Sequence, residues 1–194
     1  MLDNKKIEEA KRNAIKSINK EEIIKTEDST FVTFFLQNSG NSLETAKLLF
    51  EVSTNSKLNL SLGFPEFNGF LWVINASYYS MFYAVRALLE SRGIKLKAEE
   101  SIHFLTFNAL IYYFFSNKTL ERKFIEDFEE AGEEASAILG KEKASNIIED
   151  YTSEKEKRAK FTYEMGVIAL KGKAETSLQR AKRFNEEIRK LIKL

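Results

Sequence analysis

The only histidine of the chain, His103, is the first candidate for chemistry. An imidazole takes up and releases protons near neutral pH, so one well-placed histidine can serve as an acid or a base. His103 follows Glu99 and Glu100 and lies near the start of a long apolar segment. The structural alternative is a histidine at a helix terminus that hydrogen-bonds a neighbouring carboxylate. Both interpretations stay open on the sequence.

A stripe of aromatic and charged residues is the second candidate. When each residue of the segment 68–92 is turned by about 100°, one face collects Asn75, Tyr79, Tyr83, Arg86 and Glu90. The planar guanidinium of arginine suits a phosphate group. Arg86 is therefore either a cation–π or carboxylate partner inside the protein, or a positive group at a binding cleft.

The chain lacks the residues of common metal sites. With no cysteine it has no disulfide, cysteine nucleophile or thiolate zinc site, which suits a reducing compartment. One histidine excludes a His-Glu-x-x-His site within a single chain. Two Glu-x-x-Glu spacings occur, but without Glu-x-x-His pairs they predict a solvated helix face rather than a metal site: Glu126, Glu129, Glu130 and Glu133. We expect no metal and no cofactor.

Charge is segregated along a chain whose net charge is only +1. Residues 121–150 carry 10 acidic and 4 basic side chains, whereas residues 171–194 carry 8 basic and 3 acidic ones. The simpler interpretation is two solvated helix faces that lie against each other. The alternative is a basic last helix that contacts phosphates through Lys182, Arg183 and Lys190.

Eight glycines and one proline in 194 residues predict a mostly helical chain. We expect a single all-α antiparallel bundle of about seven helices, with a long loop at 54–69 and with Gly40 ending the second helix. The segment 101–115 is apolar on nearly every side and is expected to be the central helix. Periodicity predicts helices at residues 4–25, 29–40, 43–52, 68–92, 101–115, 120–139, 141–163 and 173–194.

The start of the chain and its apolar content favour a soluble, cytoplasmic protein. Residues 1–13 are charged and have no apolar core of a secretory signal. The longest apolar run, Ala109 to Phe115, is far shorter than the ~20 residues that span a bilayer. We expect one domain and no membrane association.

Two segments together resemble the HEPN domain. Residues 42–50 read Ser-Leu-Glu-Thr-Ala-Lys-Leu-Leu-Phe, similar to the family's Leu-x-x-Ala-Lys-x-Leu-Leu helix. Residues 76–89 read Ala-Ser-Tyr-Tyr-Ser-Met-Phe-Tyr-Ala-Val-Arg-Ala-Leu-Leu, similar to Tyr-Tyr-Ala-Met-Phe-His-Ala-x-Arg-Ala-Leu-Leu, with Tyr83 at the position of the histidine. The resemblance covers about residues 40–170. It implies a HEPN-like core at 41–170, a helical extension at 1–40 and a basic helix at 171–194.

The functional signature of that family is an arginine followed four to six residues later by histidine, or Arg-x-x-x-Asp-Tyr in similar proteins. The matching segment here is Arg158-Ala-Lys-Phe-Thr-Tyr163, with Thr162 in place of the acid. The resemblance implies a homodimer whose paired arginines bind RNA or a nucleotide, and metal-independent ribonuclease activity in its active members. Tyrosine has a reference pKa of about 10, so Tyr163 favours phosphate binding over cleavage. Five residues apart, Arg158 and Tyr163 would point about 140° apart on a regular helix.

The resemblance also assigns roles. Arg158 and Tyr163 become the candidate catalytic residues, and the candidate RNA- or nucleotide-binding residues are Arg158, Arg86, Tyr79, Tyr83 and His103. If His103 reaches Arg158 in the fold, it replaces the missing histidine. A toxin–antitoxin role beside a minimal nucleotidyltransferase partner is the implied setting. The alternative is a non-catalytic module that dimerises or holds a partner.

Overall fold

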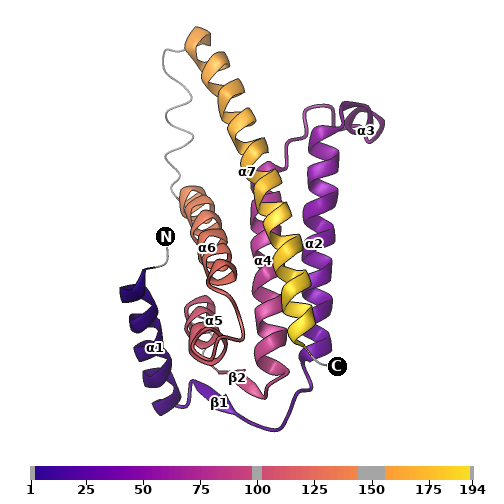
Figure 1. Ribbon diagram of the computed structural model, residues 1–194. Coiled ribbons are helices and arrows are strands. Elements are labelled where there is room, and N and C mark those ends of the chain that lie inside the picture. Colours follow the sequence, from indigo (N-terminus) through magenta and orange to yellow (C-terminus); the bar gives the residue numbers. More distant parts are fainter. Residues whose placement is uncertain (1–2, 98–101, 144–155, 193–194) are drawn as a thin grey trace.

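The computed structural model describes residues 3–97, 102–143 and 156–192, and within them the side chains outside 139–169. These parts form helices and one two-stranded sheet (Figure 1), which confirms the predicted all-α bundle. The elements are α1 (Asn4–Asn19), β1 (Ile23–Lys25), α2 (Val32–Thr54), α3 (Ser56–Ser61), α4 (Phe70–Glu90), β2 (Ile94–Leu96), α5 (Ile102–Leu110), the π-helical segment η1 (Ile111–Phe115), α6 (Arg122–Lys143) and α7 (Glu156–Leu191).

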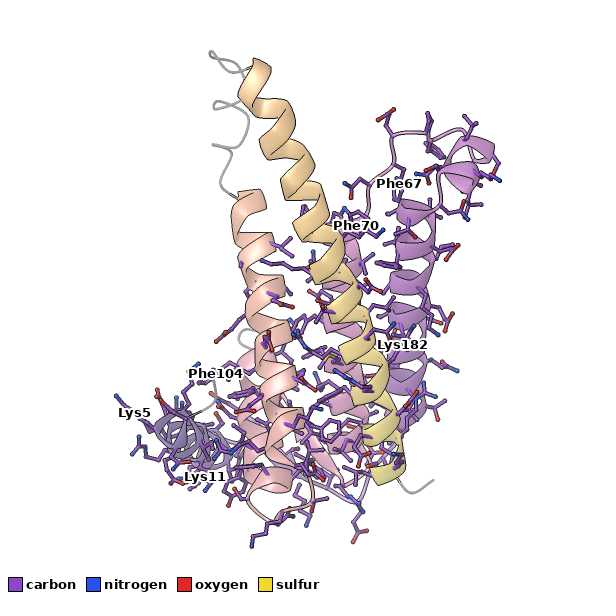
Figure 2. All side chains as sticks on the ribbon, turned by 45° about the horizontal axis from the view of Figure 1, so that its top comes forward. Lys5, Lys11, Phe67, Phe70, Phe104 and Lys182 are labelled. Atoms are coloured by element: carbon purple, nitrogen blue, oxygen red, sulfur yellow. The ribbon has the colours of Figure 1, made fainter. Side chains whose placement is uncertain are left out.

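Helix α4 is the axis of the bundle. It packs against α2, α7, α6 and α5, and Figure 2 shows side chains filling the space between α4 and its neighbours. The predicted apolar arc of this helix is buried throughout: Ile74, Tyr78, Met81, Phe82, Val85, Leu88 and Leu89. Burying apolar side chains on this scale is the main stabilising contribution to a helical core.

The expectation that 101–115 forms the central helix is wrong. This segment is the short helix α5 followed by the π-helical turn η1, and it packs mainly beside α1 and α4. Phe104 is 52% exposed, so the segment has a solvent face despite its composition. Apolar composition alone cannot tell a wrapped helix from one whose aromatic side chains lie partly at the surface.

Three predicted helix breaks are absent. Gly40 lies inside the continuous helix α2, residue 140 lies inside α6, and the described residues 156–163 and 173–191 share the single helix α7. Residues 144–155 of the predicted helix 141–163 lie outside the described residues. Glycine in a helix interior costs about 1 kcal/mol relative to alanine, a penalty that packing of α2 against α4 can offset. The expected divisions after residues 40 and 170 consequently fall inside α2 and α7. Short helix α3 occupies part of the predicted loop at 54–69.

The first predicted helix is shorter than expected. Helix α1 ends at Asn19, Glu21 adopts a left-handed φ of 58°, and Ile23–Lys25 then forms strand β1. This strand pairs antiparallel with β2, with Ile23 opposite Leu96. β-Branched residues suit a strand, and the side chain of Ile23 is buried, with an exposed fraction of 1%. This two-stranded sheet joins the segment before α2 to the segment that follows α4 (Figure 1).

The described residues form two apolar clusters. The larger extends from Ile7 on α1 to Ile192 after α7, and the smaller, between α2, α4 and α7, holds Ala46, Phe70, Val73, Ile74, Ala174 and Leu178. The inward-facing residues predicted for the acidic and basic helices are buried or half-buried, as expected from their periodicity: Phe124, Ile125, Phe128, Leu178, Ala181, Phe184, Ile188, Leu191 and Ile192. Among the described residues, no helix combines the length and apolar character needed to cross a membrane.

Candidate functional site

The predicted stripe on α4 faces the side of α2 and forms an aromatic surface. The rings of Tyr79 and Tyr83 lie 6.2 Å apart, and Tyr83 stacks on Phe35 of α2 at 6.4 Å with 23° between the planes. One helix turn separates successive members of the stripe, so their side chains lie side by side along α4. Phe35 is a member of this surface that sequence reasoning missed.

Arg86 continues this surface toward the C-terminal end of α4. Its guanidinium carbon lies 4.7 Å from the centre of the Phe35 ring and 6.0 Å from that of Phe82. These contacts of Arg86 agree with the cation–π interpretation of this residue. Among the described residues, no hydrogen bond or ion pair engages the guanidinium. Burial lowers the pKa of Arg86, and the nearby carboxylate of Glu90 acts in the opposite direction. The guanidinium stays charged, because the pKa of arginine is very high.

His103 packs against the other side of the same surface. Its ring centre lies 4.4 Å from that of Phe82 and 5.8 Å from that of Tyr79. Its Nδ1 atom is 2.6 Å from the hydroxyl oxygen of Tyr78. The neighbouring carboxylates of the sequence interpretation, Glu99 and Glu100, lie outside the described residues. Partial burial and the charge of Arg86 both lower the pKa of His103, which favours the neutral imidazole.

Four predicted site residues therefore come together, and we call them the α4 cluster: Tyr79, Tyr83, Arg86 and His103. The other two, Arg158 and Tyr163, lie on the N-terminal part of α7, where their side chains are outside the described residues. The predicted approach of His103 to Arg158 rests on those side chains and stays a prediction. The histidine instead packs on Phe82, the ring that Arg86 also approaches, and the charge of Arg86 acts on its pKa.

Two grooves meet at the Tyr83–Phe35 stack. We call the first the amide groove; it has a volume of about 550 Å³, lies between α2 and α4, and is lined by Asn38, Asn41, Ser42, Thr45, Leu49, Trp72, Asn75, Ala76, Tyr79 and Tyr83. The second, the cationic groove, has about 580 Å³ and is lined by Ile24, Thr26, Asp28, Phe31, Phe34, Phe35, Arg86, Glu90, Lys95, Leu96 and Lys97. Sequence reasoning missed Phe31, Phe34 and Phe35, although their i, i+3, i+4 spacing is that of one helix face.

The other buried charges of the cationic groove are already paired. Glu90, 3% exposed, accepts hydrogen bonds from the Lys95 ammonium at 2.5 Å and from the backbone N–H of Phe31 at 3.2 Å. Lys95 also donates to Asp28 at 2.9 Å. Burial acts to lower the pKa of Lys95, but its hydrogen bonds to Glu90 and Asp28 outweigh this and raise it. Within this groove, Arg86 is thus the half-buried cation that forms no hydrogen bond or ion pair with a described carboxylate, because Glu90, which acts on it electrostatically, is bonded to Lys95.

The acidic helix α6 and the basic helix α7 do contact each other, as the simpler interpretation of their charges predicted. Arg180 of α7 is 4% exposed and lies 2.9 Å from Glu130, 2.9 Å from Glu134 and 3.8 Å from Asp127. Glu129 and Glu133 bind Lys6 of α1 at 2.9 and 3.3 Å. Among the described residues, no group of carboxylates and histidine is arranged to hold a metal ion.

The basic residues proposed as an alternative phosphate surface lie on the outer side of α7. Arg183 and Lys190 are exposed and Lys182 is half-buried, and Figure 2 marks Lys182 midway along the helix. Lys190 pairs with Glu187 at 3.0 Å. Among the described residues, these basic side chains line neither of the two grooves above nor a third one beside His103. The α4 cluster is therefore the better candidate site among the described residues.

No protein-family model matches the chain, and neither a curated protein nor a solved structure matches it. The resemblance to the HEPN domain thus rests on the two segments at 42–50 and 76–89.

Proposed function

We propose that this protein binds single-stranded RNA or a nucleotide along the α4 cluster. The observation that carries the proposal is Arg86, a half-buried guanidinium held on the Phe35 ring, with no hydrogen bond or ion pair to a carboxylate among the described residues. A charge of this kind costs desolvation unless something pairs with it. Phosphate suits the planar donor fork of arginine better than any neutral ligand.

The aromatic rings beside Arg86 support the same proposal. Tyr79, Tyr83 and Phe35 form a continuous surface of ring faces and edges next to the guanidinium. Proteins that bind single strands combine such rings, on which bases stack, with cations that contact the backbone phosphates. Because the net charge of the chain is only +1, attraction of RNA has to come from this local arrangement rather than from the overall charge of the protein.

The resemblance to the HEPN domain extends the proposal to a homodimer. In that proposal two copies would present Arg158 across a shared cleft, and the setting would be a toxin–antitoxin pair with a minimal nucleotidyltransferase as partner. Light scattering across a concentration series tests the dimer. A monomer at every concentration would contradict the two-subunit cleft while leaving binding at Arg86 open to its own test.

Fluorescence anisotropy with a labelled, unstructured single-stranded RNA tests the binding proposal. The protein should bind with an affinity that falls as salt rises, and Arg86→Ala should weaken binding to all sequences and reduce the slope of log K against log [salt] by about 0.7. Arg12→Ala, which removes an exposed arginine from α1, is the matched control and should change neither quantity. Equal loss in both variants would argue against a site at Arg86.

Ribonuclease activity is a second candidate function, and the neutral His103 near Arg86 favours it. With Nδ1 bonded to Tyr78, Nε2 of a neutral imidazole can accept the proton of the ribose 2′-hydroxyl, whose oxygen then bonds to phosphorus. The bond from phosphorus to the 5′-oxygen breaks, that oxygen takes a proton from water, and a guanidinium can stabilise the charge on the attacked phosphate. Incubation of the protein with RNA in the presence of a chelator should then give fragments that end in cyclic phosphate. Absence of cleavage, or cleavage unchanged by His103→Gln, would remove the enzyme proposal and leave binding alone.

A further inference from the structure

The amide groove holds a polar side chain that the fold does not use. Asn75 is 5% exposed, lines the groove, and forms no hydrogen bond through Oδ1 or Nδ2 with any described group. Buried amides are normally hydrogen-bonded, because an unpaired one lowers the stability of the fold. Asn75 offers one donor group and one acceptor at the same place, which is the pattern of a recognition site.

The neighbours of Asn75 suit a flat, unsaturated ligand. Trp72 and Tyr79 lie three residues before and four residues after Asn75 on α4, so their side chains flank the amide on the helix surface. Trp72 is 54% exposed, an unusual position for the only tryptophan of the chain. On the α2 side, Asn41, Ser42 and Thr45 complete the wall of the groove. Aromatic faces around a polar centre are the arrangement in which unpaired bases are held.

We propose that the amide groove takes an unpaired adenine of a bound RNA, an inference that rests on the proposed function. Adenine presents an N6 amino donor beside the N7 acceptor, so the Asn75 carbonyl accepts from N6 while its NH₂ donates to N7. Guanine presents O6 and N7, two acceptors, and its O6 would face the Asn75 carbonyl. Stacking on Trp72 and Tyr79 favours the larger face of a purine over a pyrimidine.

Binding requires the Asn75 side chain to turn. Each of its two polar atoms exposes less than 1 Å² to solvent, so the amide reaches a base only after rotating toward the groove that it lines. The rotation exchanges two unpaired groups for two hydrogen bonds, which makes it favourable only when the matching base is present. Asn75 therefore distinguishes adenine from guanine only when a base occupies the groove.

The spacing between Asn75 and Arg86 points to an oligonucleotide as the ligand. Eleven residues of α-helix (86 minus 75) cover about 16 Å at 1.5 Å per residue. The Tyr79–Tyr83 pair lies between the two positions and continues the aromatic surface. One strand therefore runs along α4, with its adenine at Asn75 and a phosphate of another nucleotide at Arg86.

Anisotropy with two matched RNAs tests this inference on the full chain. The probes are uridine-rich ten-nucleotide strands that differ only in one central base, adenine or guanine. The adenine strand should bind about five- to a hundredfold more tightly, the range expected of one two-bond base contact. Asn75→Leu keeps the size of the side chain; it should remove this ratio and raise the melting temperature by about 2–4 °C, because the unpaired amide is gone.

Asn108→Leu is the matched control, since Asn108 of α5 is 1% exposed with an unpartnered Nδ2 and lies outside the amide groove. It should leave the adenine-to-guanine ratio unchanged. Asn75→Ala repeats the test with a smaller side chain. Equal binding of the two strands by the unaltered protein, or a ratio that survives in both Asn75 variants, would overturn the inference.

A titration with adenosine separates this inference from the proposed function. If RNA does not bind but adenosine binds in an Asn75-dependent way, the base site stands and RNA binding falls. If neither binds, the base site is overturned as well. RNA binding that depends on Arg86 but shows no base preference leaves the proposed function standing and removes the adenine site alone.

Discussion

The Tyr78 hydroxyl lies 2.6 Å from Nδ1 of His103, and the two rings are 5.5 Å apart at an angle of 31°. Burial raises the pKa of Tyr78, so its hydroxyl stays protonated and can donate to Nδ1 or accept from it, according to the imidazole tautomer. When the imidazole proton is on Nδ1, Tyr78 accepts it in a hydrogen bond and Nε2 is free to accept a proton. This contact holds the only histidine of the chain against α4.

His103 should make the stability of the protein depend on pH between about 5.5 and 7.5. Its pKa is lowered in the folded state, whereas an unfolded histidine has a pKa of about 6.5. The unfolded chain therefore binds the proton first as pH falls, and the free energy of unfolding decreases from pH 7.5 to 5.5. Urea unfolding at several pH values measures this slope. Its persistence in His103→Gln would assign the pH dependence to other groups.

Replacing Arg86 by Gln should raise the pKa of His103. The positive charge of Arg86 disfavours imidazolium in the folded protein, and glutamine removes that charge while keeping a polar side chain. NMR titration of the single imidazole reads the pKa directly. Arg12→Gln is the control and should leave it in place. An unchanged value in Arg86→Gln would mean that burial alone lowers the pKa.

Arg180→Ala should destabilise the fold by about 1–3 kcal/mol, because it removes the charged hydrogen bond to Glu134 and leaves the neighbouring carboxylates of α6 without their cation. Arg180 is 4% exposed and contacts Glu130 and Glu134 at 2.9 Å each. Lys190→Ala removes a surface pair with Glu187 and should cost no more than about 1 kcal/mol. Denaturant unfolding compares the two. Equal small losses would contradict a structural role for the Arg180 cluster.

Gly93→Ala should destabilise the protein by more than about 2 kcal/mol. Gly93 has φ +69°, and a Cβ there would lie 1.8 Å from the backbone oxygen of Thr26, so the backbone must shift as well as tolerate left-handed strain. Gly63 also has a positive φ, +80°, but no atom lies within 4 Å of its Cβ position. Gly63→Ala therefore measures the strain alone, at about 1–2 kcal/mol. Similar losses in thermal unfolding of both variants would show that the contact with Thr26 is unimportant.

The helical faces were predictable from local periodicity. The buried arc on α4 and the inward face at the C-terminal end of α7 follow from apolar spacing near 3.6 residues, which depends only on neighbouring positions in the chain. The stripe with Tyr79, Tyr83 and Arg86 was predicted from the same helical spacing. The side chains of that stripe lie together because one rigid helix carries them.

Helix ends were less predictable, because they depend on partners far along the chain. Gly40 is compatible with a helix end, but α2 continues through it against α4. Ile23 fits an amphipathic helix by spacing, but it forms strand β1 because Leu96 lies opposite to pair with it. A local preference of about 1 kcal/mol is easily outweighed by such tertiary contacts.

The chemistry of the α4 cluster was decided by tertiary packing. Residue types alone allowed Arg86 to be either a buried partner or a binding group. The ring of Phe35, 51 positions earlier, holds its charge at a groove where no described carboxylate forms an ion pair with it. His103 meets Tyr78 because α5 packs on α4. The unpaired amide of Asn75 is likewise a property of the α2–α4 groove. Residue order determines which faces are apolar, but only the packing of those faces decides which polar groups are left without a partner.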